Sequence, residues 1–258
     1  MRVLAAPEQH RSGLLVPAVF TLVGLALLIG LGVWQLERKA WKENLIDSNT
    51  RRLSAAPAPL PPPVRWASLD AAHDEFTRVT FRAVFENDQE ALVFAGASAF
   101  RPDTSGTGYW IFTPARPEGS ARVVVNRGFV PEANKDRGTR AAGLINGPAD
   151  IVGVLRWPEH GSWFTPGGEP ARNLWFARDQ LAIAAAKGWG NVAPFYVEQE
   201  APLPPGGLPQ PGKLTVNLPN NHLQYAITWF SLAVVLAAVF IAFARARRRE
   251  KEASGGGF

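Results

Sequence analysis

The stretch "NNHLQYAITWFSLAVVLAAVF", residues 220–240, decides the fold class. No charged side chain occurs over residues 223–244, and a helix of that length crosses a hydrocarbon core of roughly 30 Å. The stretch therefore predicts a transmembrane helix. His222 stands at its start, where an imidazole is either an ordinary interfacial side chain or a ligand held at the membrane boundary.

A second uncharged run, "SGLLVPAVFTLVGLALLIGLGVWQL", occupies residues 12–36. It is longer than a typical secretory signal core and no small-residue cleavage site follows it, so we expect a retained membrane helix. Basic residues crowd the C-terminal tail from Arg245 to Lys251, and an excess of Lys and Arg marks the cytoplasmic side. Three cations just beyond the first run oppose this orientation, but long domains translocate largely regardless of charge. We expect both termini to be cytoplasmic.

The composition narrows the classes of site. The chain has no cysteine, which excludes disulfides, thiolate metal sites and thiol nucleophiles. It has one methionine and four scattered histidines, so we expect no copper site, which needs soft sulfur ligands or clustered imidazoles. The net charge of +5 owes much to the C-terminal tail and to the cations after the first apolar run. It indicates a membrane surface and not nucleic acid.

The region between the two runs predicts a small β-rich domain. The segment "FTRVTFRAVFE" at residues 76–86 alternates apolar and polar side chains, as a half-buried strand does. Further strand candidates are separated by Gly- and Pro-rich turns and lie at residues 91–96, 108–114, 121–128, 150–157 and 193–199. One helix is expected between Asp179 as N-cap and Gly188 as C-cap.

We therefore predict a membrane protein in which two transmembrane α-helices flank a mainly antiparallel β (α+β) extracytoplasmic domain. The first helix is expected to continue beyond the bilayer and to pass into the Pro-rich linker "SAAPAPLPPP". The expected segments, in chain order, are a cytoplasmic tail over 1–12, a transmembrane helix over 13–36, a juxtamembrane extension and linker over 37–63, the β-rich domain over 64–221, a transmembrane helix over 222–244 and a basic cytoplasmic tail over 245–258.

Aromatic and basic residues follow the first apolar run at helical spacing. They form two neighbouring faces, Trp34, Arg38, Trp41 and Leu45 on one and Gln35, Lys39, Lys42 and Ile46 on the next. One interpretation is interfacial anchoring by Trp and by snorkelling cations. The other is a cradle for an anionic ligand, with the Arg38 guanidinium as the donor.

On the second helix, His222, Tyr225 and Trp229 share a face. This places the imidazole above two aromatic rings, which suits an axial ligand of haem iron but equally a histidine that caps the helix or faces water. Small residues that would let the two helices approach closely are expected at Ala26, Gly30, Ala233 and Ala237.

The remaining motifs give weaker signals. "VVVNRGFVP" at residues 123–131 predicts a strand that runs into a turn at Asn126 and Gly128, leaving Arg127 to pair with an acid or to contact a partner. The motifs G-x-S-x-G, H-E-x-x-H, P-loop and C-x-x-C-H are absent from the sequence. We expect no enzyme, and any haem would be held without covalent attachment.

Taken together, these stretches resemble the Surfeit-locus (Surf/Shy) family of cytochrome c oxidase assembly factors. The resemblance covers nearly the whole chain in the family's order, through "GVWQLERKAWKENLI", "GTGYWIFTP", "VVVNRGFVP", "NLWFARD", "APFYVE" and "NNHLQYAITWFSLA". The first and last of these, at the two membrane boundaries, are the specific ones. Phe129 stands where the family often has Trp, a change that keeps an aromatic ring.

The resemblance implies an inner-membrane protein that helps to mature the haem-containing subunit I of cytochrome c oxidase and receives haem a from haem a synthase. The short N-terminal tail, without a mitochondrial transit peptide, adds the expectation of a bacterial member in the inner (plasma) membrane with a periplasmic domain. In the family, the histidine that opens the second span is the proposed ligand of the haem iron, and here that residue is His222.

Two hypotheses follow from the resemblance. In the first, His222 ligates haem a, the rings of Trp34, Tyr225 and Trp229 line the macrocycle, and Arg38 or Lys42 meets a propionate. In the second, the protein is a scaffold that stabilises oxidase intermediates without binding haem. Its aromatic and basic surfaces, Trp41 and Arg127 among them, then contact protein partners.

Overall fold

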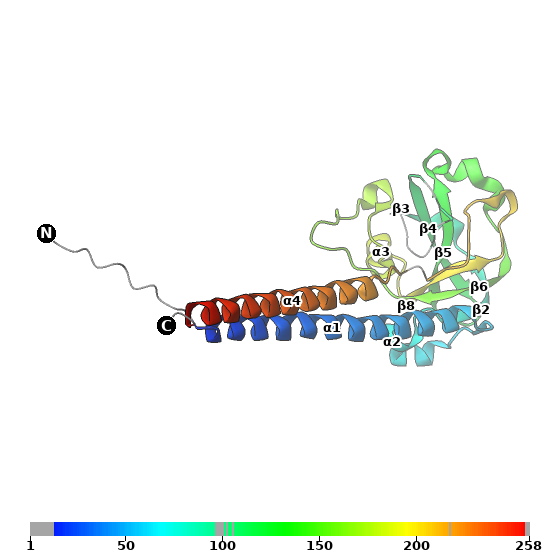
Figure 1. Cartoon of the computed structure of the whole chain (residues 1–258). Helices are drawn as coiled ribbons and strands as arrows, with labels where there is room; N and C mark the ends of the chain where they lie inside the picture. The colour runs from blue at the N-terminus through cyan, green and yellow to red at the C-terminus, as the bar shows by residue number, and fades with distance from the viewer. Residues whose placement is uncertain (1–12, 96–100, 102, 105, 217, 256–258) are drawn as a thin grey trace. The chain divides into compact units, whose positions relative to one another are not determined.

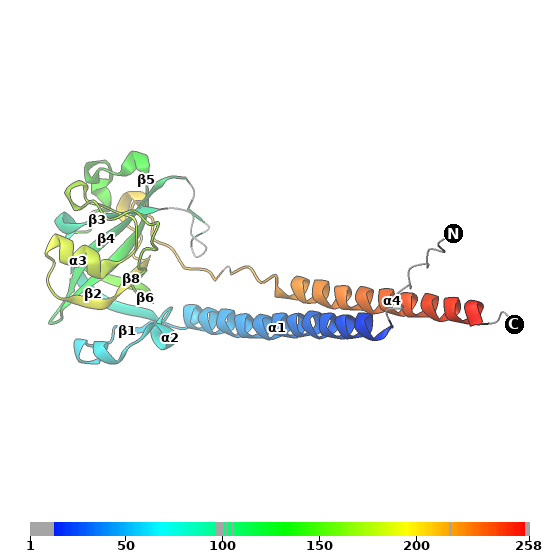
Figure 2. The same ribbon diagram turned by 90° about the vertical axis from the view of Figure 1, so that its left-hand side faces the viewer.

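The computed structural model of the chain describes residues 13–95, 101, 103–104, 106–216 and 218–255. It divides into two compact units, the first made of residues 1–45 and 219–258 and the second of residues 46–218. Among the described residues, two helices are long and apolar enough to cross a membrane: α1 (Leu15–Ser54) and α4 (His222–Gly255). In the first unit they lie side by side (Figures 1 and 2).

The second unit carries the strands. The described strands are β1 (Ala58–Pro59), β2 (Arg78–Phe85), β3 (Ala91–Ala95), β4 (Gly108–Pro117), β5 (Arg122–Pro131), β6 (Pro148–Arg156), β7 (Leu174–Trp175) and β8 (Val192–Ala201). Two short α-helices join them, α2 (Ala71–Asp74) and α3 (Gln180–Lys187). The six strands and the one helix expected in the domain are thus confirmed, and so is the fold class of two candidate membrane helices flanking an α+β domain.

The strands form one mixed sheet in the order β1-β2-β6-β8-β5-β4-β3-β7 (Figure 1). Because β4 also pairs with β2, the strands β2, β6, β8, β5 and β4 close into a small barrel. Most pairs are antiparallel, but β1 with β2, β3 with β7 and β5 with β8 are parallel. Closure removes the open edges of these five strands, while β1 and the strands β3 and β7 extend the sheet outside the ring.

The core lies on both faces of the barrel wall. One cluster, around Phe85, Ile151 and Phe195, gathers residues from β2, β6 and β8 together with Trp66. A second packs α3 against the opposite face of the strands through Ile183. The strand β5 contributes to both clusters, which explains its unbroken run of buried residues in place of an alternating pattern.

The local signals around α3 are confirmed in detail. The Asp179 carboxylate accepts hydrogen bonds from the backbone N–H groups of Leu181 and Ala182, at 3.1 and 3.0 Å. Gly188 ends the helix in the left-handed conformation at φ 66°. Both ends of α3 therefore satisfy backbone groups that a helix leaves unpaired.

Candidate functional site

The two long helices of the first unit approach each other where α1 carries glycine. A Cβ atom added at Gly32 would lie 2.5 Å from the ring of Phe230, and one added at Gly24 would lie 2.9 Å from Leu236. Ala233 is the small buried residue that α4 offers in this part of the interface. Glycines on α1 therefore make room for larger side chains of α4, and small residues at an interface let helices pack closely in lipid.

The expected pair of small residues on α1 was wrong. Ala26 and Gly30 are exposed, and a Cβ atom at Gly30 would meet nothing within 4 Å. The interface uses Gly24 and Gly32, which lie on a neighbouring face of the same helix. On α4, Ala233 is buried and Ala237 is half-buried, as expected.

His222 opens α4 and is half-buried. Its ring nitrogen Nδ1 lies 2.7 Å from the amide oxygen Oε1 of Gln35 on α1. Because an amide oxygen only accepts, Nδ1 is the donor of this contact, and Nε2 is the second ring nitrogen. Among the described residues, Nε2 has no hydrogen-bond partner. A neutral histidine that donates through Nδ1 binds a metal through Nε2.

Two lysines near the same end of the helix pair are engaged. Lys42 donates through Nζ to the backbone carbonyl of Pro219, which precedes α4. Lys39 forms an ion pair with Glu43 one turn further along α1, at 2.7 Å. Lys42 therefore helps to hold the start of α4 against α1.

Arg38 makes a contact of a different kind. Its guanidinium lies 4.0 Å from the centre of the Trp41 ring, a cation–π contact. Among the described residues it has no hydrogen bond and no ion pair, so its donors remain open for an anion. The structure thus brings Arg38 to Trp41 and Lys42 to the start of α4.

The three rings expected to surround a ligand differ in their exposure. Trp34 is 53% exposed and Tyr225 is 56% exposed within the protein, while Trp229 is half-buried. In the described part of the chain, no ring contact joins these three side chains. They offer apolar surface to a ligand, to lipid or to another protein.

Gln35 is the residue of this site that sequence reasoning did not single out. The helical face of Gln35, Lys39 and Lys42 is half-buried, whereas Trp34 and Arg38 on the neighbouring face are exposed. The helical spacing of Gln35 and Lys42 already placed both residues on one face of α1. The sequence did not show that α4 packs against that face, so Gln35 could not be recognised as a partner of His222.

Arg127 is not at a surface turn, which corrects the expected placement. The strand β5 continues through it, because Gly128 adopts φ 119° and its missing side chain leaves room for the backbone of Gln210. Arg127 is 1% exposed and donates to Asn87 Oδ1 and to the Gly143 carbonyl, at 2.9 and 2.7 Å. Such a side chain holds the interior together and offers no surface to a partner.

Burial also affects the pKa of Arg127. Removal from water lowers the pKa of its guanidinium to about 10, while the nearby Glu90 carboxylate acts in the opposite direction. The group is therefore still charged at neutral pH. Charge buried in this way is compatible with folding because its hydrogen bonds go to fixed oxygen acceptors.

The residues at the helix pair fit the haem that the resemblance implies. A haem held without covalent attachment would need a side-chain ligand for its iron, which the Nε2 atom of His222 could supply. Its acidic substituents need cations, and Arg38 has open donors. Its apolar ring needs aromatic or aliphatic surface, which Trp34 and Tyr225 expose.

Comparisons with known proteins agree on one family. The model of the SURF1 family matches residues 22–234. A "SURF1-like protein" of Monosiga brevicollis is 35% identical over 82% of this chain and 81% of its own length. "Surfeit locus protein 1" of Takifugu rubripes is 33% identical over 86% of this chain and 95% of its own length. "Surfeit locus protein 1" of Homo sapiens is 32% identical over 79% of this chain and 69% of its own length.

Proposed function

The chain belongs to the SURF1 family, and we propose that it assists the assembly of haem–copper cytochrome c oxidase by binding haem a. It would aid the delivery of this haem into subunit I or its retention there. The observation that carries the proposal is the 2.7 Å hydrogen bond from His222 to Gln35, because it engages Nδ1 and leaves Nε2 available where the two helices meet.

Each residue has a distinct part in this proposal. His222 would hold the haem iron through Nε2, and Gln35 would fix the tautomer and ring orientation of that histidine. Arg38 pairs with a propionate through its open donors, and Lys42 is the alternative cation. Trp34, Tyr225 and Trp229 would offer apolar surface to the ring, and the bound haem would supply an iron that accepts a nitrogen ligand. Transfer onward requires reversible ligation, which one histidine suits better than two.

The location follows from the same resemblance and from the charge distribution. We place the protein in the inner (plasma) membrane of a bacterium, with α1 and α4 crossing the bilayer and the sheet domain in the periplasm. The basic residues from Arg245 to Arg249 support a cytoplasmic location for both termini. Subunit I and haem a synthase are the proposed partners, and no catalytic step is assigned to this chain.

A scaffold that never binds haem is the second candidate. Three exposed aromatic side chains favour it: Trp41, which is 51% exposed, and also Trp34 and Tyr225. Exposed aromatic residues are typical anchors of protein interfaces. In that case, the same surface contacts an oxidase intermediate.

The absorption spectrum of the purified full-length protein separates the two functions. The protein is isolated from cells that make haem a and, as a control, from cells that lack its synthesis. The haem-binding function predicts haem a in the first preparation at a fixed ratio to protein. Haem-free protein that still copurifies with subunit I would support the scaffold instead.

A further inference from the structure

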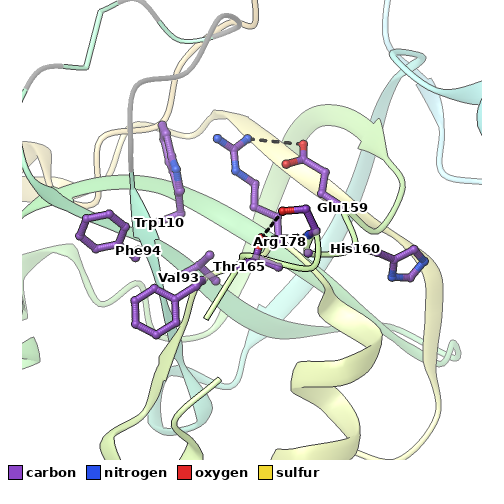
Figure 3. A pocket seen from close by; sticks show the side chains of 11 residues that line it. Val93, Phe94, Trp110, Glu159, His160, Thr165 and Arg178 are labelled. Atoms are coloured by element: carbon purple, nitrogen blue, oxygen red, sulfur yellow. Dashed lines mark hydrogen bonds and ion pairs between the residues drawn. The ribbon is translucent and has the colours of Figure 1, made fainter. Parts of the chain in front are cut away.

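A cavity of about 310 Å³ opens on the second unit, between β3, β4 and the loop that follows β6 (Figure 3). Side chains from these strands and from the segment before α3 line it, among them Val93, Phe94, Trp110, Glu159, Thr165 and Arg178. We call it the Arg178 cavity. It shares no residue with the proposed haem site.

Arg178 lacks a hydrogen-bonded carboxylate in the described part of the chain. Its side chain is 12% exposed and its nearest acid is Glu159, at 3.9 Å. The same Glu159 oxygen already accepts a hydrogen bond from Arg156 at 2.6 Å. Figure 3 shows the Arg178 guanidinium between Trp110 and Glu159, and it lies 4.8 Å from the Trp110 ring centre. The aromatic ring fixes this cation without neutralising it.

The other charges around the cavity have closer partners. Arg101, which also lies over Trp110, forms two hydrogen bonds with Asp103 at 2.8 and 2.9 Å. The buried Glu198 accepts a hydrogen bond from Asn126 at 2.9 Å. Arg178 is therefore the charged group here whose donors are left for an incoming acid.

Apolar side chains stand next to this cation. The ring of Phe94 is 41% exposed and lies 6.1 Å from that of Phe176, and both line the cavity together with the buried Val93. A cation beside an apolar wall favours a ligand that has a carboxylate and an apolar group close together.

The turn from Ser162 to Thr165, beside the cavity, carries two exposed aromatic rings. Trp163 is 96% exposed and Phe164 is 72% exposed, in edge-to-face contact at 5.5 Å. The Thr165 N–H donates to the Ser162 carbonyl, and the Ser162 N–H donates to Thr165 Oγ1, both at 2.9 Å. These bonds hold the turn in one shape, and Ser162 and Thr165 also line the cavity.

Exposed rings on a preformed turn bind at low entropic cost, because little freedom remains to be lost. Two adjacent rings this exposed are typical of an interaction site. The turn and the Arg178 cavity are neighbouring surfaces, since Gly161, Ser162 and Thr165 line the cavity and also flank or form the turn that carries the two rings.

We propose that this surface binds an extended segment of another protein that carries an Asp or Glu next to an apolar residue. Arg178 receives the carboxylate, the Phe94 wall receives the apolar neighbour, and Trp163 with Phe164 covers the segment from the turn. This docking function is separate from haem binding and does not depend on it.

The test uses the full-length protein in detergent and a displayed library of short random peptides. Selected peptides should carry an acidic residue beside an apolar one. Changing that acid to its amide should weaken binding to the wild type about tenfold or more. The same change should have no effect on binding to Arg178→Gln, because the group that reads the charge is gone.

Control variants separate this effect from misfolding. Arg172→Gln removes an exposed arginine paired with Glu169 and should bind as the wild type does. Combined Trp163→Ser and Phe164→Ser changes leave the core untouched, and they should weaken the acidic peptide and its amide by the same factor. If Arg178→Gln loses its circular dichroism signal, the test rests on two other comparisons. These are the binding of the acidic peptide and of its amide to the wild type, and the binding of both peptides to the variant with Trp163→Ser and Phe164→Ser.

Three results would overturn the proposal. The first is a selection without enrichment of acidic residues. The second is an acid-to-amide change that costs as much on folded Arg178→Gln as on the wild type. The third is competition by free acetate as strong as that by the peptide, which would mark a site for small acids in place of a docking surface.

Discussion

The amide oxygen of Gln35 on α1 lies 2.7 Å from Nδ1 of His222 at the start of α4. The contact joins residues 187 positions apart in the sequence, so it exists only when the two helices pair. It also decides which ring nitrogen of His222 is free. The pairing of the helices and the chemistry of the histidine are thereby linked.

Replacing Gln35 by Leu should weaken haem binding about ten- to a hundredfold, since groups that orient a metal-ligating histidine contribute on this scale. Haem titration of the purified variant measures the change. The matched control is Gln224→Leu on α4, where the side chain has no described partner. Equal affinities for the two variants would show that the Gln35 contact does not orient the ligand.

Replacing Gly32 by Leu should separate α1 from α4, because a Cβ atom there would lie 2.5 Å from the Phe230 ring. Overpacking of this kind typically costs about 1–3 kcal/mol. A lower midpoint of thermal unfolding in detergent would report it. Gly30→Leu adds the same side chain in open space and should leave the midpoint unchanged. Similar losses in both variants would count against the helix packing described above.

Replacing Arg140 by Ala should destabilise the sheet domain by about 3–5 kcal/mol, because Glu90 would remain buried without its counterion. The pair is bidentate, at 2.5 and 3.0 Å, and both side chains are at most 9% exposed. Denaturant unfolding followed by near-ultraviolet circular dichroism measures the loss. Arg172→Ala breaks an exposed pair and should cost less than about 1 kcal/mol. A cost below that level for Arg140→Ala would contradict the role assigned to the buried pair.

Two buried tyrosines should make the domain sensitive to alkali. Burial, aided by Glu132, raises the pKa of Tyr109 to about 12, and burial also raises the pKa of Tyr196. A tyrosine ionises near pH ~10 in the unfolded chain. The folded state therefore keeps protons that the unfolded state loses, so stability is complete below pH ~10 and falls as pH rises towards about 12.

Tyrosinate absorbance tests this window. The Tyr225→Phe variant retains only Tyr109 and Tyr196 of the three tyrosines in the sequence. Neither should ionise near pH ~10 while the domain stays folded. Ionisation of either one at that pH, without loss of circular dichroism, would contradict the burial found here.

Most elements of the fold could be predicted from sequence patterns that lie within a single element. The alternation of residues 76–86 predicted β2, and the Asp179 and Gly188 caps predicted α3, because both depend on residues within one element. The membrane helices followed from uncharged length alone. The parallel pairing of β5 with β8 was not predictable, because register between distant strands has no signature in either segment.

The site was predicted less completely. His222 could be singled out because a histidine at the end of an apolar run is conspicuous, but its partner Gln35 depends on how two helices face each other. Arg127 was misplaced because an Asn-Arg-Gly sequence is typical of turns, whereas here Gly128 lets a continuous strand pass close to Gln210. The exposure of Trp163 depends on the tertiary turn that carries it.

The haem a content of His222→Ala tests the central claim most directly. The variant protein is purified from cells that make haem a, beside the wild type and His160→Ala, which removes an exposed histidine paired with Asp179. Our account predicts that His222→Ala keeps its fold and loses most of its haem, while His160→Ala retains a wild-type content and spectrum. A His222→Ala protein with the haem content and spectrum of the wild type would contradict the account.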